Sequence, residues 1–513
     1  MSAGASKDIL AYPKVPYIPF WRLYGKPFVT VTPNGPDDGG DFGPNTPGTQ
    51  TAGIQEAINF LSSQMVSNGG YTFPLGGTVF IKRGIYILNA GIDLSKAQQI
   101  NLIGEGVTYQ GGSVTQGAQV NTLGATVLQF ASTVPAGTSM FYNSNTVNGA
   151  NNYLCTLVIR DMQLIGTSST NCIDFSFLSL GNPGLAGLYN VSIQGFNKGI
   201  FQQQTAANSG VNVNISHVSF YGCTYGFGDP NQYTLATQQF PHSIRDVFFF
   251  GDTHAISVNL LQMTFLSAQV FGGDVVIRNI INSKVELLIL NVGSAKAFTT
   301  TNSAGAGGSI VNSEVSLMFN SCGSSSSGVH LADIEGNIEC SKIKIYTYNT
   351  AAPPSGSTTV LLYLYANLVG SAVELYSYES SAGLQPIQWA GGALYYSQII
   401  GGIYNSSPWT STSIPNNLTL KNFIVNVRGI NPVGFITAPA VPASGTTNTV
   451  ANPYPYPVEV FINGAVTGIY ITPAGKTQTQ VFGSVSNATV RLNPGDAIAL
   501  TYTTAPTWTW YGL

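Results

Sequence analysis

The chain repeats a short pattern of alternating apolar and polar residues between about residues 160 and 427. Each copy has a polar or small residue, then two apolar residues separated by one residue, and often a closing Gly or Asn. Alternation of this kind, rich in Val, Ile and Phe, predicts β-strands. The lead apolar positions are Met162, Val191, Val218, Val247, Val270, Val285, Val315, Ile343, Val373, Ile399 and Phe423.

Successive lead positions are 23–30 residues apart, except for a step of 15 residues from Val270 to Val285. A repeat of this length is typical of a β-solenoid, in which each turn buries its inward face against the next turn. The lead positions are therefore expected to point inward. Charged residues predict the same register, because Lys284, Glu314 and Lys342 occupy one equivalent position. Lys344 and Glu374 share the next outward position.

The sequence on either side of the repeats differs in character. Residues 1–40 contain many prolines and aromatic residues, which predicts an extended arm rather than a helix or a central strand. A short helix is expected next, with Ile54, Ile58 and Leu61 on one apolar face and Thr51 as its N-cap. We therefore predict a docking arm over 1–40 and a cap helix with a parallel β-helix over 41–435.

The end of the chain has its own pattern. Residues 436–449 are rich in Pro, Gly, Ser and Thr and predict a linker. Residues 450–513 alternate in short runs that predict a small antiparallel β domain of sandwich-like type. The fold class that we expect is therefore all-β: a parallel β-helix with an N-terminal cap helix and a small C-terminal domain.

The start of the β-helix resembles a known family. A helix followed by Gly-Gly-Thr-Val-Phe-Ile at 76–81, Gly-Ile-Tyr-Ile at 84–87 and Ile-Gly-Glu-Gly at 103–106 is similar to the cap and first turn of pectin-lyase-like right-handed β-helices. The family includes pectate lyases, polygalacturonases and viral tailspikes. The resemblance implies a right-handed helix. The sequence departs from the family in one respect. The family usually has an acidic pair just before its cap helix, whereas Asp37 and Asp38 lie well upstream of the helix expected here.

The tail, from Pro453-Tyr-Pro-Tyr-Pro457 to Ala505-Pro-Thr-Trp-Thr-Trp510, also resembles a known group. It is similar to the C-terminal domain of receptor-binding spikes of spindle-shaped viruses of hot-acid archaea. This resemblance implies a homotrimeric spike that is fixed to a tail or hub protein of the virion by its N-terminal end, here residues 1–40. The expected location is the virion surface, and the first ten residues show no signal-peptide core.

Composition excludes several other classes of protein. Only 8% of the 513 residues are charged and the formal net charge is −3, so a nucleic-acid partner is not expected. No apolar run is long enough for a membrane span. Five cysteines, Cys155, Cys172, Cys223, Cys322 and Cys340, lack metal-site spacing, and their disulfide state is open. We expect no metal and no cofactor.

Candidate catalytic residues are few. Glycoside hydrolysis needs two carboxyl groups about 5–9.5 Å apart, and the best local pair is Asp246 and Asp252, with His217 one turn away. Asp161, Asn190, His217 and Asp246 share one position in four turns, so the alternative is a polar ladder whose side chains satisfy turn backbone. A second acidic group, Asp333, Glu335 and Glu339 with Lys342 nearby, also fits a solvated face.

Candidate receptor-binding residues lie at the end of the chain. Trp508 and Trp510 are two residues apart on one face of the expected last strand, and Tyr511 follows them. They fit a platform for stacking of sugar rings, although large aromatic side chains more often pack in a core, here that of the small domain. The function that we expect is attachment of a virion to the host-cell surface, through a glycan or a glycoprotein. The alternatives are a polysaccharide-degrading lyase or glycoside hydrolase on the same scaffold, and a purely structural shaft.

Overall fold

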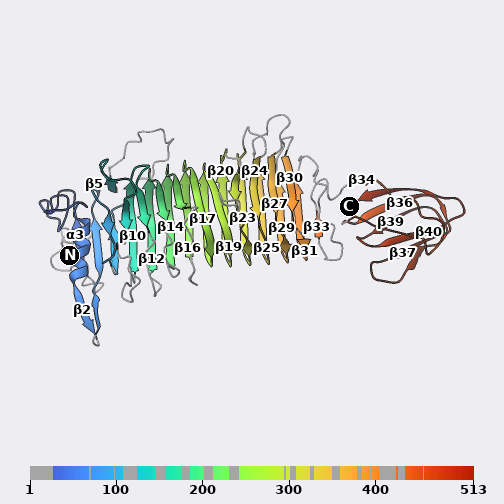
Figure 1. Cartoon of the computed structure of the whole chain (residues 1–513), viewed down its shortest axis with the longest axis horizontal. Helices are drawn as coiled ribbons and strands as arrows, with labels where there is room; N and C mark the ends of the chain where they lie inside the picture. The colour runs from blue at the N-terminus through green and yellow to red at the C-terminus, as the bar shows by residue number, and fades with distance from the viewer. Residues whose placement is uncertain are drawn as a thin grey trace, which may run out of the picture. The chain divides into compact units, whose positions relative to one another are not determined.

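The structure is a computed structural model in which the chain divides into two compact units, Met1–Leu290 and Asn291–Leu513. Figure 1 labels the helices and strands. Residues 1–26 of the expected arm lie outside the described residues, as does Cys155. The described residues are 27–68, 71–97, 99–107, 124–142, 144, 156–174, 185–201, 212–229, 242–293, 296–300, 308–323, 329–348, 359–377, 384–392, 394–403, 423–425, 434–454 and 456–513.

The first unit opens with the cap helix and the first turn. The helix α3 (Ile54–Ser63) buries Ile54, Ile58 and Leu61, as predicted. Its N-cap is Gly53, in the left-handed region with φ 84°, and not Thr51. The Thr51 hydroxyl still accepts a hydrogen bond from the Gln55 amide at 3.1 Å, so it caps the first turn from two positions further out. An antiparallel hairpin, β2 (Met65–Asn68) and β3 (Tyr71–Pro74), follows the helix.

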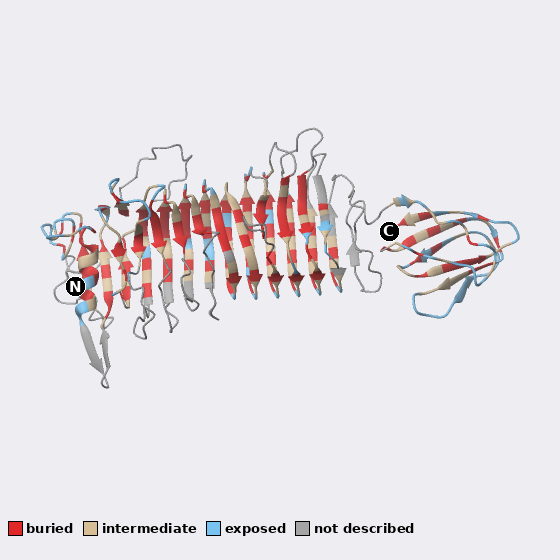
Figure 2. Cartoon of the chain, in the orientation of Figure 1, coloured by how far each residue is buried: buried red, intermediate tan, exposed pale blue. Residues whose placement is uncertain are grey.

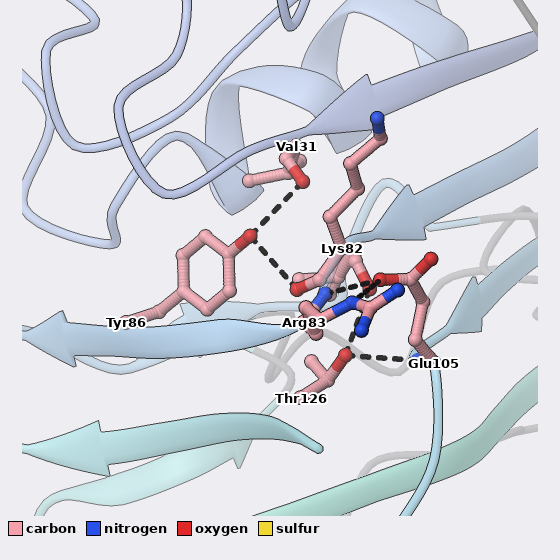
Figure 3. A network of polar contacts seen from close by, with 7 residues as sticks. Val31, Lys82, Arg83, Tyr86, Glu105 and Thr126 are labelled. Carbon is pink, nitrogen blue, oxygen red and sulfur yellow. Dashed lines mark hydrogen bonds and ion pairs between the residues drawn. The ribbon is translucent and has the colours of Figure 1, made fainter. Parts of the chain in front are cut away.

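Residues at the end of the expected arm belong to the body of the protein. The strand β1 (Phe28–Val31) pairs in parallel with β4 (Gly77–Ile81), and Val29 and Val31 are buried. Figure 3 shows how the Tyr86 hydroxyl joins this strand to the next turn: it lies 3.1 Å from the Val31 carbonyl oxygen and 2.9 Å from that of Lys82. Burial raises the pKa of Tyr86, so the hydroxyl remains a donor. The alternation Phe-Val-Thr-Val explains why the chain enters the sheet here.

Two parallel sheets alternate along the chain of the first unit. One contains β1, β4, β7 (Ile100–Ile103), β10 (Thr156–Ile165), β12 (Leu185–Gln194), β14 (Asn212–Tyr221), β16 (His242–Phe250), β18 (Thr264–Phe271) and β20 (Lys284–Leu290), with β5 (Gly84–Leu88) and β8 (Thr126–Phe130) beside them. The other contains β6 (Ile92–Asp93), β9 (Ser139–Tyr142), β11 (Asn171–Asp174), β13 (Lys198–Phe201), β15 (Tyr225–Gly228), β17 (His254–Gln262) and β19 (Asp274–Ile281). The chain visits the sheets in turn, which makes a right-handed parallel β-helix.

The register explains the irregular step in the repeat. Met162 pairs with Val191 and Val191 with Val218, as predicted. Val247 pairs with Ala268, however, whereas Val270 pairs with Phe249. The register of β16 against β18 shifts between Ile244 and Val247, where the earlier turns carry one extra residue. Val270 and Val285 therefore belong to different columns, although both are buried.

The second unit continues the same architecture. Its larger sheet contains β23 (Glu314–Asn320), β26 (Lys342–Tyr348), β29 (Ala372–Ser377), β32 (Gln398–Ile403) and β33 (Phe423–Val425). Facing strands are β21 (Lys296–Thr299), β24 (Val329–Glu335), β27 (Thr359–Tyr365) and β30 (Leu384–Gly391), with a short ladder of β22 (Ile310–Val311), β25 (Ile338–Glu339), β28 (Leu368–Val369) and β31 (Leu394–Tyr395). Buried residues alternate with exposed or half-buried ones along β23 and β26, as the colours of Figure 2 illustrate.

The predicted register of the second unit is confirmed, with one exception. Glu314 pairs with Lys342 and Lys344 pairs with Glu374. Ile399 pairs with Ile424 and not with Phe423, so the last lead position is displaced by one residue. The ion pairs run diagonally between turns, from Lys344 Nζ to Glu314 Oε1 at 2.8 Å and from Lys342 Nζ to Glu374 Oε1 at 2.5 Å. The ion pairs therefore exchange partners relative to the predicted ones, which were Glu314 with Lys342 and Lys344 with Glu374.

The C-terminal residues form two antiparallel four-stranded sheets. One has the order β34 (Gly434–Ile436), β41 (Thr507–Gly512), β36 (Val458–Val466) and β39 (Val485–Leu492). The other has the order β35 (Thr449–Ala451), β40 (Ala497–Thr501), β37 (Gly468–Thr472) and β38 (Thr479–Phe482). The expected linker packs on this domain: Val441 lies against the core, and the Tyr502 hydroxyl donates to the Pro442 carbonyl oxygen at 2.6 Å. Its apolar residues cover the core, so it does not behave as a free spacer.

We expect Val315→Asp to prevent folding of the second unit. Val315 is fully buried and stacks on Ile343 in the next turn, so the substitution would bury an unpaired charge at a cost of about 3–5 kcal/mol. The matched control is Ser316→Asp, which places the same charge at the outward position opposite Lys344. Circular dichroism and thermal melting distinguish the variants. A soluble Val315→Asp protein with the wild-type spectrum and melting temperature would contradict the register.

Candidate functional site

Four of the residues singled out in the sequence form a column at one corner of the first unit. Asp161, Asn190, His217 and Asp246 all have left-handed backbone conformations, with φ of 58°, 54°, 55° and 53°. Asn and Asp tolerate this conformation better than most residues, because their short side chains bond locally. Asn190 Nδ2 donates to Asp161 Oδ1 at 2.8 Å. This contact joins side chains of neighbouring turns, whereas the polar-ladder alternative expected bonds to turn backbone.

The structure does not bring Asp246 and Asp252 together as an accessible pair. Asp246 is exposed, and its Oδ2 lies 3.8 Å from His217 Nε2. Asp252 is only 2% exposed. Its Oδ1 accepts a hydrogen bond from the Cys223 amide at 2.6 Å, and its Oδ2 is buried without a partner among the described residues. Burial raises the pKa of Asp252 to about 7. This carboxyl group is therefore a feature of the core, out of reach of a polysaccharide.

The tryptophans of the last strand do not form an exposed platform. Trp510 is fully buried in the core of the C-terminal domain, and the Trp508 ring packs against it edge-on with centroids 5.5 Å apart. Trp508 Nε1 donates to the Pro439 carbonyl oxygen at 2.8 Å. Tyr511 lies on the other face of β41, where it contacts the exposed Phe435 ring at 5.3 Å. Tyr511 and Phe435 therefore form the surface aromatic pair here.

The second acidic group of the sequence is divided in the structure. Asp333 is fully buried and contacts Lys296 Nζ at 2.7 Å and His330 Nδ1 at 3.0 Å. Burial opposes ionisation of Asp333, but the hydrogen bonds from His330 and Lys296 outweigh it and lower its pKa. Glu335 lies 3.7 Å from the same Lys296, whereas Lys342 pairs elsewhere. A solvated face therefore describes only part of this group.

A cluster that the sequence analysis missed lies on the second sheet of the first unit. Lys198, Tyr225, His254 and Asp274 occupy one paired position on four successive turns. The Tyr225 and His254 rings stack at 4.7 Å, and His254 Nδ1 lies 2.7 Å from Asp274 Oδ1. Lys198 Nζ forms an ion pair with Asp229, which directly follows β15. One cation, one phenol, one imidazole and two carboxyl groups thus lie side by side.

The electrostatics of this cluster favour proton transfer. Burial, followed by the charges of Asp229 and Asp274, raises the pKa of Tyr225, which keeps the phenol protonated. The hydrogen bond to Asp274 raises the pKa of His254 above its usual value of 6.5. The raised pKa makes the imidazole of His254 a stronger proton acceptor. The Asp274 contact also fixes Nδ1, so that Nε2 is the nitrogen left for other chemistry.

The signal for this cluster was present in the sequence. Lys198, Tyr225 and His254 each lie three residues after a glycine that closes a repeat, at Gly195, Gly222 and Gly251. These residues stand at the heads of the strands that follow the repeated segments, and their types differ from turn to turn, so the apolar repeat does not align them. Among the described residues, no group of three or more His, Cys, Asp or Glu side chains is placed to hold a metal ion. No helix in the described part of the chain is long and apolar enough to cross a membrane.

Comparisons with known proteins were made at three levels. No family model and no curated protein matches the chain. Among solved structures, it resembles the A-module of mannuronan C-5 epimerase AlgE6 of Azotobacter vinelandii, with 13% identity, a TM-score of 0.40, and coverage of 73% of this chain and 94% of that chain.

Two viral structures are also similar. The tailspike protein of E. coli bacteriophage HK620, solved in complex with a pentasaccharide, has 12% identity and a TM-score of 0.40, with coverage of 96% and 93%. ORF18 of Geobacillus virus E2 has 14% identity and a TM-score of 0.34, with coverage of 93% of this chain and 79% of that chain. These likenesses concern the fold alone.

Asp252 is expected to make the protein less stable as the pH rises. Its pKa is about 7 in the folded chain against 3.8 as the ordinary value, so folding favours the protonated form. That stability is fully present below pH 3.8 and is lost as the pH rises through 7, by at most about 4 kcal/mol. Asp252→Asn should remove this decline and be the more stable protein above neutrality.

The measurement is the melting temperature across about pH 4 to pH 8. Asp246→Asn, at the exposed corner, is the matched control because it makes the same chemical change outside the core. An Asp252→Asn protein that loses stability with pH as steeply as the wild type would show that another group carries the effect.

Proposed function

We propose that the chain is a virion spike that attaches the particle to a polysaccharide of the host-cell surface. The observation that carries this proposal is a set of tyrosines held open to solvent on the rigid turns of the second unit. Tyr348, Tyr365 and Tyr396 are 54%, 56% and 64% exposed. The Tyr346 and Tyr376 rings stack on each other at 5.2 Å on neighbouring turns.

The chemistry of exposed tyrosines suits a sugar ligand. An aromatic face buries the C–H surface of a sugar ring, and the phenol hydroxyl adds a hydrogen bond. Neither interaction depends on ionised groups, which fits a chain with only 8% charged residues. Backbone pairing between turns fixes the positions of the rings, so little conformational entropy is lost on binding.

The remaining parts of the proposal concern assembly. We place the docking segment before Pro27, because the strand β1 already belongs to the β-helix, and its partner is a tail or hub protein of the virion. A homotrimer is proposed as the working form, and the resemblance of the tail to spikes of archaeal viruses supports both points. Sedimentation that gives a monomer at micromolar concentration would overturn the trimer. We also propose the C-terminal domain as a second receptor contact, through the rings of Tyr511 and Phe435.

The polysaccharide-acting enzyme remains a second candidate because of the cluster around His254. In a lyase, a base removes the proton beside a uronate carboxylate, the glycosidic C–O bond breaks, a C=C bond forms, and the leaving oxygen takes a proton. Lys198 would neutralise the carboxylate, His254 Nε2 would act as the base and the protonated Tyr225 as the acid. The ring of His254 stacks on Tyr225 and its Nδ1 contacts Asp274, so the proposed base and acid lie side by side.

For attachment, we expect Tyr348→Ala combined with Tyr365→Ala to weaken binding to host cells about tenfold or more. Both side chains are exposed, so the fold should be unaffected. Phe substitutions at the same positions keep the ring faces and serve as controls. Cell binding by the labelled protein is the measurement. Full binding by the double Ala variant would remove Tyr348 and Tyr365 from the proposal, and a wild-type protein that does not bind host cells would overturn attachment.

For the enzyme, wild-type protein incubated with host-surface polysaccharide should release fragments with unsaturated ends. His254→Ala should lower that rate by about 10²–10⁴. His217→Ala, at an exposed corner of the same unit, is the matched control. Chromatography with ultraviolet detection follows the products. If the wild-type protein forms no new chain ends, the second candidate is wrong.

A further inference from the structure

A corner of the second unit carries a regular ladder of buried serines. Ser313, Ser341 and Ser371 each donate their backbone amide to the hydroxyl oxygen of the serine one turn further on, at 3.0, 3.1 and 3.1 Å. The hydroxyl groups of Ser313, Ser341, Ser371 and Ser397 in turn donate to the carbonyl oxygen two residues earlier. The backbone at this corner is thereby fixed from turn to turn.

The residue before each serine has a left-handed backbone and forms a second, outer column. These residues are Asn312, Cys340, Gly370 and Tyr396, with φ of 47°, 48°, 57° and 51°. The side chains of Cys340 and Tyr396 are exposed. Gly370 lies between them and has no side chain, so the outer column is interrupted at this one turn.

The gap at Gly370 opens a groove of about 580 Å³. That volume lies within the range of about 300–1,000 Å³ typical of small-molecule sites. A Cβ atom built at Gly370 would meet only the Cys340 Sγ, at 3.9 Å, so the position has room for a side chain. The groove is lined by Asn312, Ser313, Glu314, Cys340, Ser341, Lys342, Gly370, Ser371, Ala372, Tyr396, Ser397 and Gln398.

The lining has the character of a sugar site. It combines hydroxyl and amide groups with an exposed aromatic ring, Tyr396, at one end. Its two charged residues are engaged in ion pairs, Glu314 with Lys344 and Lys342 with Glu374. From Asn312 to Tyr396 the column crosses three steps between turns, about 14 Å at the usual strand spacing. A linear chain lying along the column would meet similar backbone and hydroxyl groups at every turn.

We propose that the groove over Gly370 is a binding subsite for a linear, uncharged oligosaccharide, with one sugar ring stacked on Tyr396. This inference rests on the proposed attachment function and names one site for it. The missing side chain at Gly370 admits the ligand, and the serine ladder beneath holds the groove in shape. Cys340 lies at the wall of the groove and is the exposed cysteine among those described.

Cys340 provides a direct readout. The probes are pentasaccharides of β-1,4-glucan, α-1,4-glucan and α-1,6-mannan, and the measured quantity is the rate at which N-ethylmaleimide alkylates Cys340, followed by peptide mass spectrometry. Cys172, Cys223 and Cys322 are buried, so the peptide-level signal reports the groove. At least one pentasaccharide at saturation should slow alkylation of Cys340 in the wild-type protein about tenfold.

Three variants test the assignment. Gly370→Asn fills the gap with a residue that tolerates the left-handed backbone and should abolish protection while the melting temperature stays unchanged. Gly222→Asn makes the same change at φ 60° in the first unit, where nothing lies within 4 Å, and should keep full protection. Tyr396→Ala should raise the Kd about tenfold, and Tyr396→Phe should restore it. Rates are compared with and without sugar within each variant, because the new side chain at Gly370 contacts the Cys340 thiol.

Two results would overturn the assignment of the groove as a sugar subsite. One is equal protection of Cys340 in the wild type and in Gly370→Asn, and the other is no protection of the wild type by any of the three pentasaccharides. Binding of labelled protein to host cells is measured in parallel. If the wild type binds cells but Gly370→Asn binds them equally well, the groove is wrong and attachment stands. If a pentasaccharide protects Cys340 of the wild-type protein but that protein does not bind cells, the groove is confirmed and attachment fails.

Discussion

Parallel pairing between identical positions of successive turns is the constraint on which the rest of the structure depends. A single turn of this chain cannot bury its own apolar side chains, so each inward residue needs a similar residue directly above and below it. The columns of Met162, Val191 and Val218 and of Val315, Ile343 and Val373 meet that requirement. Because the strands are held at a fixed spacing, outward side chains also form columns.

The columns explain how a chain with few charges places polar groups. Where a corner needs a left-handed residue, the first unit uses Asp161, Asn190, His217 and Asp246, whose side chains then meet one another. Where a strand begins, the same stacking places Lys198, Tyr225, His254 and Asp274 side by side. Neither group is close in sequence, since its members are a full turn apart. Chemistry on this fold is therefore assembled along the axis of the helix.

The fold could be predicted from the sequence because the inward positions repeat. Val315 and Ile343 are separated by one turn and are both apolar, and their pairing follows from that alone. The irregular step at Val270 could not be explained from the sequence alone. It arises because one corner residue is lost between β16 and β18, and this loss leaves the apolar pattern intact. The site was harder. Asp252 and Trp510 have side chains suited to chemistry and to stacking, but burial decides their role, and burial depends on the neighbouring turns. The cluster around His254 was missed because its residues differ in type from turn to turn.

The serine ladder makes the length of the second unit adjustable. Each serine satisfies the amide of one neighbour and a carbonyl of its own turn, and the bonds that it makes reach no further than the adjacent turns. A duplicated turn that carried a left-handed residue, a serine and the following apolar pattern would continue the ladder and leave every older contact in place. Stability in such an array is close to a sum over neighbours, so a longer shaft needs no redesign of its ends. The reach of the protein can therefore change in whole turns while its surface chemistry is kept.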